Sequence, residues 1–172
     1  KPLARWSAQK LRVTDVGVGP RDLKFASACD DHTVAIYSID SEKPDRVIAA
    51  HDGPVLSVDW HPASSLVASA GADSALNVWD ARSGSRVASR RDFQDGGVTR
   101  VRWNANGNWL AAGGEDCTIQ LYDIRKFDVF CQMRGHPRAI SALDWHPVHE
   151  RMLASGCSGG AVLQWVVGYS DP

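Results

Sequence analysis

The sequence is poor in cysteine, has no long apolar run and has almost no excess of charge of either sign. Four cysteines in 172 residues are too few for a disulfide scaffold of this size. No apolar segment reaches the roughly 18 residues that a membrane-spanning helix needs, and no charged-then-apolar leader opens the chain. We therefore expect neither a disulfide framework nor a membrane partner.

The charge balance argues against a nucleic-acid footprint over the whole surface. Lysine and arginine number 19 against 20 acidic residues, for a formal net charge of −1. Residues 1–24 differ, because they carry six basic and two acidic residues. This segment either contacts nucleic acid or solvates the face of a strand, and composition leaves both readings open.

The motifs of the common enzyme and metal sites are also missing. The sequence has no GxxxxGK phosphate loop and no GxSxG nucleophile elbow. Cys29 and His32 provide only half of a zinc spacing, whereas structural zinc needs four ligands. We expect no catalytic residue, no metal, no cofactor and no small-molecule substrate.

The sequence does contain a repeat, seen most clearly in residues 51–80. Measured back from Trp79, Asp73 lies six positions away, Ser69 ten and His51 twenty-eight. Aromatic anchors recur at Tyr37, Tyr122 and Trp165, at spacings of 42 or 43 residues. The same offsets find these residues: Gln9, Ser27 and Asp31 behind Tyr37; Gln94, Ala112 and Asp116 behind Tyr122; Gly159, Ser155 and, one position further back, His136 behind Trp165.

A period of about 40–45 residues that closes on Trp-Asp after an upstream His is typical of the WD-repeat family. The resemblance implies an all-β β-propeller with four repeats, over residues 9–50, 51–92, 93–135 and 136–172, the last lacking its outer strand. Residues 1–8 would be the outer strand of a preceding blade. WD propellers most often have seven blades, so we expect a partial propeller, a fragment of a seven-bladed one.

The alternation of apolar and polar residues predicts the strands of each repeat. They are expected at residues 13–18, 24–29, 33–39 and 46–50; 55–60, 66–70, 75–80 and 86–89; 98–103, 109–113, 118–123 and 129–133; and 140–145, 152–157 and 161–167.

In WD blades the residues at the positions of His51, Ser69, Asp73 and Trp79 form one buried network. The resemblance implies that Asp73 orients His51, that His51 bonds the Ser69 hydroxyl, and that this hydroxyl accepts the indole N–H of Trp79. Only the second repeat has all four residues, and we expect its blade to be the most rigid. His51, Ser69 and Asp73 match a hydrolase triad by type, but a buried serine already bound to an indole is no nucleophile.

A further resemblance rests on the run WHPVHE at 145–150, followed by LASG at 153–156. These residues are similar to the WD-repeat subunit of the mRNA cleavage and polyadenylation specificity factor. The likeness implies a non-enzymatic scaffold in the nucleus, bound to other subunits of the cleavage and polyadenylation machinery and, through the complex, to pre-mRNA. Supporting stretches lie at residues 24–31, 58–62, 106–110, 122–125, 134–136 and 164–168.

Two sets of surface residues follow from the resemblances. In the polyadenylation family an aromatic precedes the loop His, so Trp6 would stack an RNA base with Lys10 and Arg12 near the phosphates, unless Trp6 instead packs between strands. WDAR at 79–82 and YDIR at 122–125 resemble a motif of substrate receptors of cullin-type ubiquitin ligases. On that alternative, Arg82 and Arg125 would dock the ligase adaptor, unless each simply pairs with a neighbouring acid.

Overall fold

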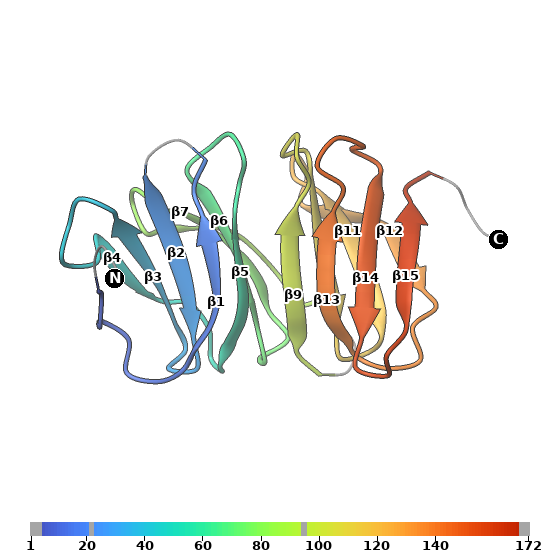
Figure 1. The fold of residues 1–172 in the computed structure, drawn as a ribbon, viewed down its shortest axis with the longest axis horizontal. Helices are drawn as coiled ribbons and strands as arrows, with labels where there is room; N and C mark the ends of the chain where they lie inside the picture. The colour runs from blue at the N-terminus through green and yellow to red at the C-terminus, as the bar shows by residue number, and fades with distance from the viewer. Residues whose placement is uncertain (1–4, 21–22, 94–95, 169–172) are drawn as a thin grey trace.

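In a computed structural model, the chain forms four antiparallel sheets (Figure 1). The structure describes residues 5–20, 23–93 and 96–168. We call the sheets blades one to four. Their strands are β1 (Val13–Val18), β2 (Lys24–Cys29), β3 (Thr33–Ser38) and β4 (Arg46–Ala49); β5 (Val55–Trp60), β6 (Leu66–Gly71), β7 (Leu76–Asp80) and β8 (Arg86–Arg90); β9 (Val98–Trp103), β10 (Trp109–Gly114), β11 (Thr118–Asp123) and β12 (Asp128–Arg134); and β13 (Ile140–Trp145), β14 (Met152–Cys157) and β15 (Val162–Val166).

The all-β propeller predicted from the repeat is confirmed, and each predicted strand end lies within one residue of the observed one. Successive side chains of a strand point to opposite faces of its sheet. The strands are rich in β-branched residues, which pack well on such a surface, so both faces of a blade can be packed. Among the described residues, no helix is long and apolar enough to cross a membrane.

Adjacent blades pack face to face through a repeated pairing of small and large residues. Ala26, Ala28 and Ile36 of blade one belong to the same buried cluster as Trp60 and Trp79 of blade two. Two further clusters join blade two to blade three and blade three to blade four. Small side chains on one face let the large rings of the next blade approach, which is the close packing that interiors require.

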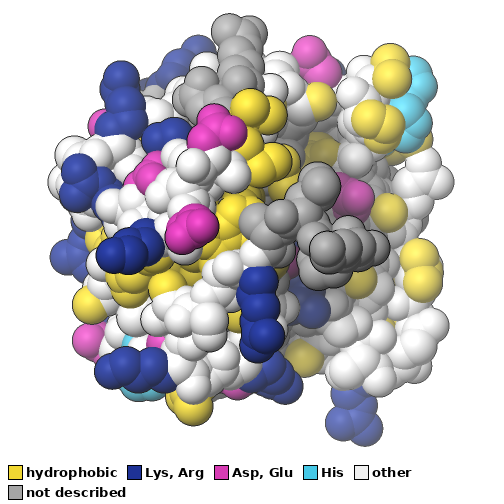
Figure 2. Space-filling view, turned by 60° about the vertical axis from the view of Figure 1, so that its left-hand side comes forward, with side chains coloured by type: hydrophobic (Ala, Val, Ile, Leu, Met, Phe, Trp, Pro, Cys, Tyr) yellow, Lys and Arg dark blue, Asp and Glu magenta, His cyan; other side chains and the backbone are white. Residues whose placement is uncertain are grey.

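The face of blade one that points away from blade two is open in the described part of the chain. Val16 and Val18 are 50% and 74% exposed, whereas the equivalent Val58 and Trp60 of blade two are 0% and 5% exposed. Figure 2 brings this side of the molecule forward and shows hydrophobic side chains bordered by both basic and acidic side chains.

Residues 5–8 form no ladder with the four described blades. The expectation that residues 1–8 are the outer strand of a preceding blade stays a prediction, because no such blade is among the described residues. Trp6 packs its ring edge against Phe25 of blade one, at a centroid distance of 5.0 Å. Residues 1–4 lie outside the described part.

Candidate functional site

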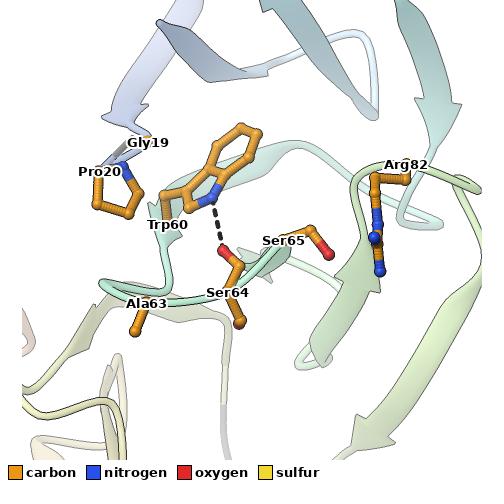
Figure 3. A pocket seen from close by; sticks show the side chains of 7 residues that line it. All are labelled: Gly19, Pro20, Trp60, Ala63, Ser64, Ser65 and Arg82. Carbon is orange, nitrogen blue, oxygen red and sulfur yellow. Dashed lines mark hydrogen bonds between the residues drawn. The ribbon is translucent and has the colours of Figure 1, made fainter. Parts of the chain in front are cut away.

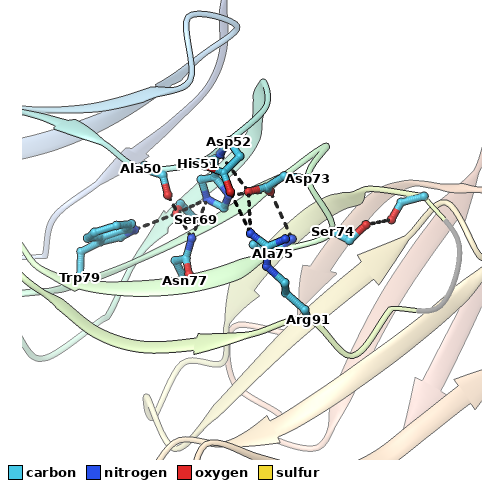
Figure 4. A network of polar contacts seen from close by, with 11 residues as sticks. Ala50, His51, Asp52, Ser69, Asp73, Ser74, Ala75, Asn77, Trp79 and Arg91 are labelled. Atoms are coloured by element: carbon cyan, nitrogen blue, oxygen red, sulfur yellow. Dashed lines mark hydrogen bonds and ion pairs between the residues drawn. The ribbon is translucent and has the colours of Figure 1, made fainter.

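Blade two holds the four marked side chains in one hydrogen-bonded chain (Figure 4). His51 Nδ1 lies 2.8 Å from Asp73 Oδ1, and His51 Nε2 lies 2.7 Å from Ser69 Oγ. The indole Nε1 of Trp79 donates to the same Ser69 oxygen at 2.8 Å. The network therefore joins the loop before β5, strands β6 and β7, and the turn between them.

Burial sets the protonation of this network. Ser69 is fully buried and His51 is 9% exposed. Burial lowers the pKa of His51 although the Asp73 carboxylate opposes the shift, so the ring is neutral at pH 7. Burial alone would raise the pKa of Asp73, but the Asp52 N–H and the His51 ring together hold it below its ordinary value.

These positions rule out nucleophilic catalysis by Ser69. Its oxygen accepts the indole N–H of Trp79 and is hydrogen-bonded to His51. Because Ser69 is fully buried, a substrate has no access to this oxygen. Within residues 5–20, 23–93 and 96–168, no group of three or more His, Cys, Asp or Glu side chains is placed to hold a metal ion.

Blade one builds a longer version of the network. Gln9 stands where blade two has His51, and its Oε1 accepts the Ser27 hydroxyl at 2.5 Å. Its amide nitrogen donates to Thr33 Oγ1 at 3.1 Å, and the Thr33 hydroxyl donates to Asp31 at 2.5 Å. Thr33 thus bridges two residues that touch directly in blade two. Within the described residues, Tyr37 forms no hydrogen bond to this network.

Blade three replaces the polar core with an aromatic one. A Cβ built on Gly114 would meet the Phe93 ring at 2.4 Å, as a Cβ on the equivalent Gly71 would meet His51 at 2.5 Å. Phe93 therefore fills the place of the histidine ring. The spacing predicts Gln94 at that place, and Gln94 lies outside the described residues. The offset of Phe93 is twenty-nine, the same as that of His136 in blade four.

The other marked residues of blade three form two separate contacts. Asp116 accepts the Thr118 hydroxyl at 2.8 Å, which holds its turn closed. The Tyr122 hydroxyl donates to Gln120 Oε1 at 2.8 Å instead of reaching the second strand, where Ala112 offers no oxygen.

Blade four keeps the centre of the network but lacks the acid. His136 Nε2 lies 2.6 Å from Ser155 Oγ, and the Trp165 indole donates to the same oxygen at 2.7 Å. Gly159 occupies the position of Asp73.

A second network, which the sequence reasoning missed, links three blades along the inner strands. Asp15 of β1 accepts the Ser57 hydroxyl of β5 at 2.7 Å and the Arg102 guanidinium of β9 at 3.0 Å. Burial opposes ionisation of Asp15, but Arg102 and Ser57 hold its pKa below the ordinary value. The available signal was the presence of polar and charged residues within the first strand of each of these blades.

The RNA candidates lie in differing surroundings. Trp6 is half-buried, its indole donates to the Ser41 carbonyl at 2.6 Å, and its edge packs on Phe25. The Lys10 backbone N–H donates to the Asp31 carboxylate at 2.9 Å. Lys10 is exposed. Arg12 is 75% exposed and pairs with Asp30 at 3.0 Å.

The adaptor candidates are both exposed. Arg125 has 78% of its side chain in solvent and holds Asp123 through two bonds, which lowers the pKa of that carboxyl to about 2. Arg82 is 79% exposed and lies 3.8 Å from Asp80. It lines a hollow of about 320 Å³, with Trp60 and Pro20 across from it (Figure 3).

Comparison with known families gives one match. The model of the WD domain, G-beta repeat, matches residues 42–80, 86–123 and 128–165. Each matched stretch begins at the outer strand of one blade, or a few residues before it, and ends in the third strand of the next. The sequence repeat therefore straddles two blades and ties them together.

Several curated proteins resemble part of the chain. It is 41% identical over 70 residues to actin-interacting protein 1 of Drosophila melanogaster, covering 39% of the chain and 11% of that protein. The chain is 39% identical over 67 residues to transcription initiation factor TFIID subunit 5 of Caenorhabditis elegans, covering 39% of the chain and 10% of that protein. It is 36% identical over 83 residues to the GATOR2 complex protein WDR24 of Homo sapiens, covering 45% of the chain and 10% of that protein. The match spans about a tenth of each relative. These are diverse WD proteins, and none of the three is a polyadenylation factor.

Proposed function

Because the chain belongs to the WD-repeat family, we propose that it is a non-enzymatic scaffold of pre-mRNA 3′-end cleavage and polyadenylation. The coarser part of this statement follows from the fold, since WD propellers are in general protein-interaction scaffolds that work in complexes. Under the proposal the protein acts in the nucleus, beside the other subunits that recognise the polyadenylation signal.

The observation that carries the proposal is the loop formed by WHPVHE at 145–150. His146 Nδ1 accepts the backbone N–H groups of Val148 and His149, at 3.1 and 2.9 Å, so the ring fastens its own loop. Val148 then projects into solvent with 76% exposure. A fastened loop with an exposed apolar tip is suited to docking a protein partner, because little conformational entropy is lost on binding.

Blade two supplies a matched control for this loop. His61 Nδ1 accepts the Ala63 N–H at 3.0 Å in the equivalent His-Pro turn. In both loops the histidine Nδ1 accepts a backbone N–H two residues on, but Ala63 stands where blade four presents Val148. A contact specific to WHPVHE should therefore depend on Val148 and not on Ala63.

The test is affinity capture from nuclear extract with the protein or its Val148→Asp or Ala63→Asp variant, read by mass spectrometry. We expect the protein to recover the other cleavage and polyadenylation subunits. Val148→Asp should reduce that recovery about tenfold, whereas Ala63→Asp should leave it unchanged. Absence of those subunits from the unmodified capture would contradict the proposal.

A second candidate is a substrate receptor of a cullin-type ubiquitin ligase, supported by the exposure of Arg82 and Arg125 in successive blades. On this candidate, the same capture recovers a ligase adaptor, and replacing both arginines with alanine abolishes its recovery. Arg125 is already held by Asp123, so the first candidate is favoured.

Contact with pre-mRNA is proposed through the complex and falls on Lys10 and Arg12, since packing engages the Trp6 ring. If both cations contact phosphates, Lys10→Ala and Arg12→Ala should each lower the slope of log affinity against log salt by about 1 for AAUAAA RNA. Lys43→Ala is the control, because Lys43 lies in an exposed loop outside this group.

A further inference from the structure

The histidine of blade four has a buried nitrogen without a partner. His136 is 7% exposed, and its Nε2 bonds Ser155. Its Nδ1 is fully buried and has no hydrogen-bond partner in the described part of the chain. A buried polar group left unpaired costs about 1–3 kcal/mol, so this atom needs an explanation.

The missing partner must be an acceptor. The Trp165 indole can only donate, so it donates to Ser155 Oγ. The Ser155 hydroxyl then has its own proton to give, and His136 Nε2 is the acceptor within reach. This assignment places the ring proton on Nδ1, as in blade two, where Nδ1 faces the Asp73 carboxylate.

The turn beside His136 has the shape that carries an acid in blade two. Gly160 has a φ of +85°, and the equivalent Ser74 has a φ of +63°. The backbone of the preceding Gly159 needs no such conformation, so a side chain is not excluded there by φ. A Cβ on Gly159 would instead meet Arg138 Cγ at 2.9 Å. The side chain of Arg138 thus lies over the place of the missing acid.

The loop has also lost the backbone donor that serves this acid elsewhere. Asp52 N–H donates to Asp73 at 3.0 Å, and Lys10 N–H donates to Asp31 at 2.9 Å. Blade four has Pro137 at that position, which has no N–H. A carboxylate at the blade-four site is therefore held by fewer internal bonds, which suits a group that arrives and leaves.

We propose that the carboxylate of an Asp or Glu side chain in a partner protein enters this site and accepts the His136 Nδ1 proton. Arg138 is exposed and forms no ion pair within the described residues, so it is free to swing off Gly159 and pair with the incoming carboxylate. Blade two shows that this surrounding suits an acid, since Arg91 lies 3.7 Å from Asp73 on its outer side. Beyond Gly160 nothing lies within 4 Å of a built Cβ, which leaves the approach open.

The test is an NMR titration of the full 172-residue chain, following the His136 ring signals. The probe is a blocked pentapeptide with one aspartate between glycines, and its asparagine counterpart is the control. We expect the aspartate peptide to shift the His136 signals and the asparagine peptide to leave them unmoved. Arg138→Gln should weaken the aspartate peptide about tenfold, because a charged hydrogen-bonding partner is lost.

Gly159→Asp fills the site from within the chain and should abolish the shift while preserving the fold, which the melting temperature checks. Three results with the peptides would overturn the proposal: no shift at any peptide concentration, an equal shift with asparagine, or a shift that survives Gly159→Asp. Acetate separates a free anion from a peptide side chain, and acetate that binds as well as the peptide also overturns the assignment to a protein partner.

Discussion

Blade two and blade four have the same His–Ser–Trp centre and differ in the acid. In blade two Asp73 accepts from His51 and from the backbone N–H groups of Asp52 and Ala75. It thereby joins the loop before β5 to the turn after β6. In blade four Gly159 joins nothing, yet His136 still bonds Ser155 at 2.6 Å.

The comparison separates two functions of the network. The serine connects a ring in the loop to an indole in the third strand, and this connection persists without the acid. The acid connects two surface loops and gives the histidine its second partner. We infer that the serine stabilises the core of a blade and that the acid fixes its rim.

The largest effect is expected from removing the serine of blade two. Ser69→Ala leaves the Trp79 indole buried without a partner and leaves His51 Nε2 with only its 3.5 Å contact to Asn77 Nδ2, at a cost of about 3 kcal/mol. Ser155→Ala should cost about half as much, because Trp165 is only partly buried and water can reach its N–H. Urea unfolding of both variants measures the difference. Equal losses would show that burial of the indole does not set the cost.

The acid of blade two should contribute less. Asp73→Ala is expected to lower the free energy of unfolding by about 2 kcal/mol at pH 7, because it breaks bonds to a buried ring and two backbone donors. The pKa of Asp73 is lower in the folded state, so its stabilisation is present above pH 3.8 and disappears as pH falls through the folded-state pKa.

The measurement is urea unfolding of Asp73→Ala and the unmodified chain from pH 7 down to pH 2. Their difference in unfolding free energy should shrink as Asp73 becomes protonated. A difference that stays constant would mean that the charge of Asp73 contributes nothing.

The sequence allowed the fold and the blade-two network to be predicted because both depend on local regularities. Strand alternation has a period of two, and the spacing of His51, Ser69 and Asp73 behind Trp79 repeats through the chain. The spacing marked the four positions, and the resemblance to WD blades implied the network that joins them.

The remaining contacts depend on geometry that spacing does not encode. Phe93 takes the histidine position of blade three because the loop before β9 places it there, one residue from the predicted one. Asp15 meets Arg102, 87 positions along the chain, only because the inner strands of three blades converge. No periodic pattern specifies that convergence.

Asp59 of β5 and Asp144 of β13 occupy equivalent places in the two blades and differ in burial. Burial raises the pKa of Asp59 from 3.8 to about 6, whereas Asp144 is exposed. The folded state therefore binds this proton more tightly than the unfolded state, and the unmodified chain loses stability as pH rises through the window from 3.8 to about 6.

Asp59→Asn should remove this loss while still accepting the Trp103 N–H. The variant is expected to gain about 1.5 kcal/mol on the unmodified chain between pH 4 and pH 7, after allowance for partial exposure of the carboxyl. Asp144→Asn is the matched substitution at the exposed, equivalent position. Thermal melts across this range decide the point, and parallel pH profiles for Asp59→Asn and the unmodified chain would exclude a buried proton at Asp59.

The smallest expected effect is the most direct test of the comparison, because it gives blade four the acid of blade two. Gly159→Asp supplies an acceptor for His136 Nδ1 and removes the backbone freedom of a glycine, for a gain of about 1 kcal/mol. The gain is smaller than the loss from Asp73→Ala because Pro137 offers no N–H and the Arg138 side chain must move aside. Gly160→Ala is the matched control and should lower stability, since its φ of +85° is strained for any side chain. If Gly159→Asp were as destabilising as Gly160→Ala, the turn of blade four would differ from that of blade two, and the absent acid would have a purely steric cause.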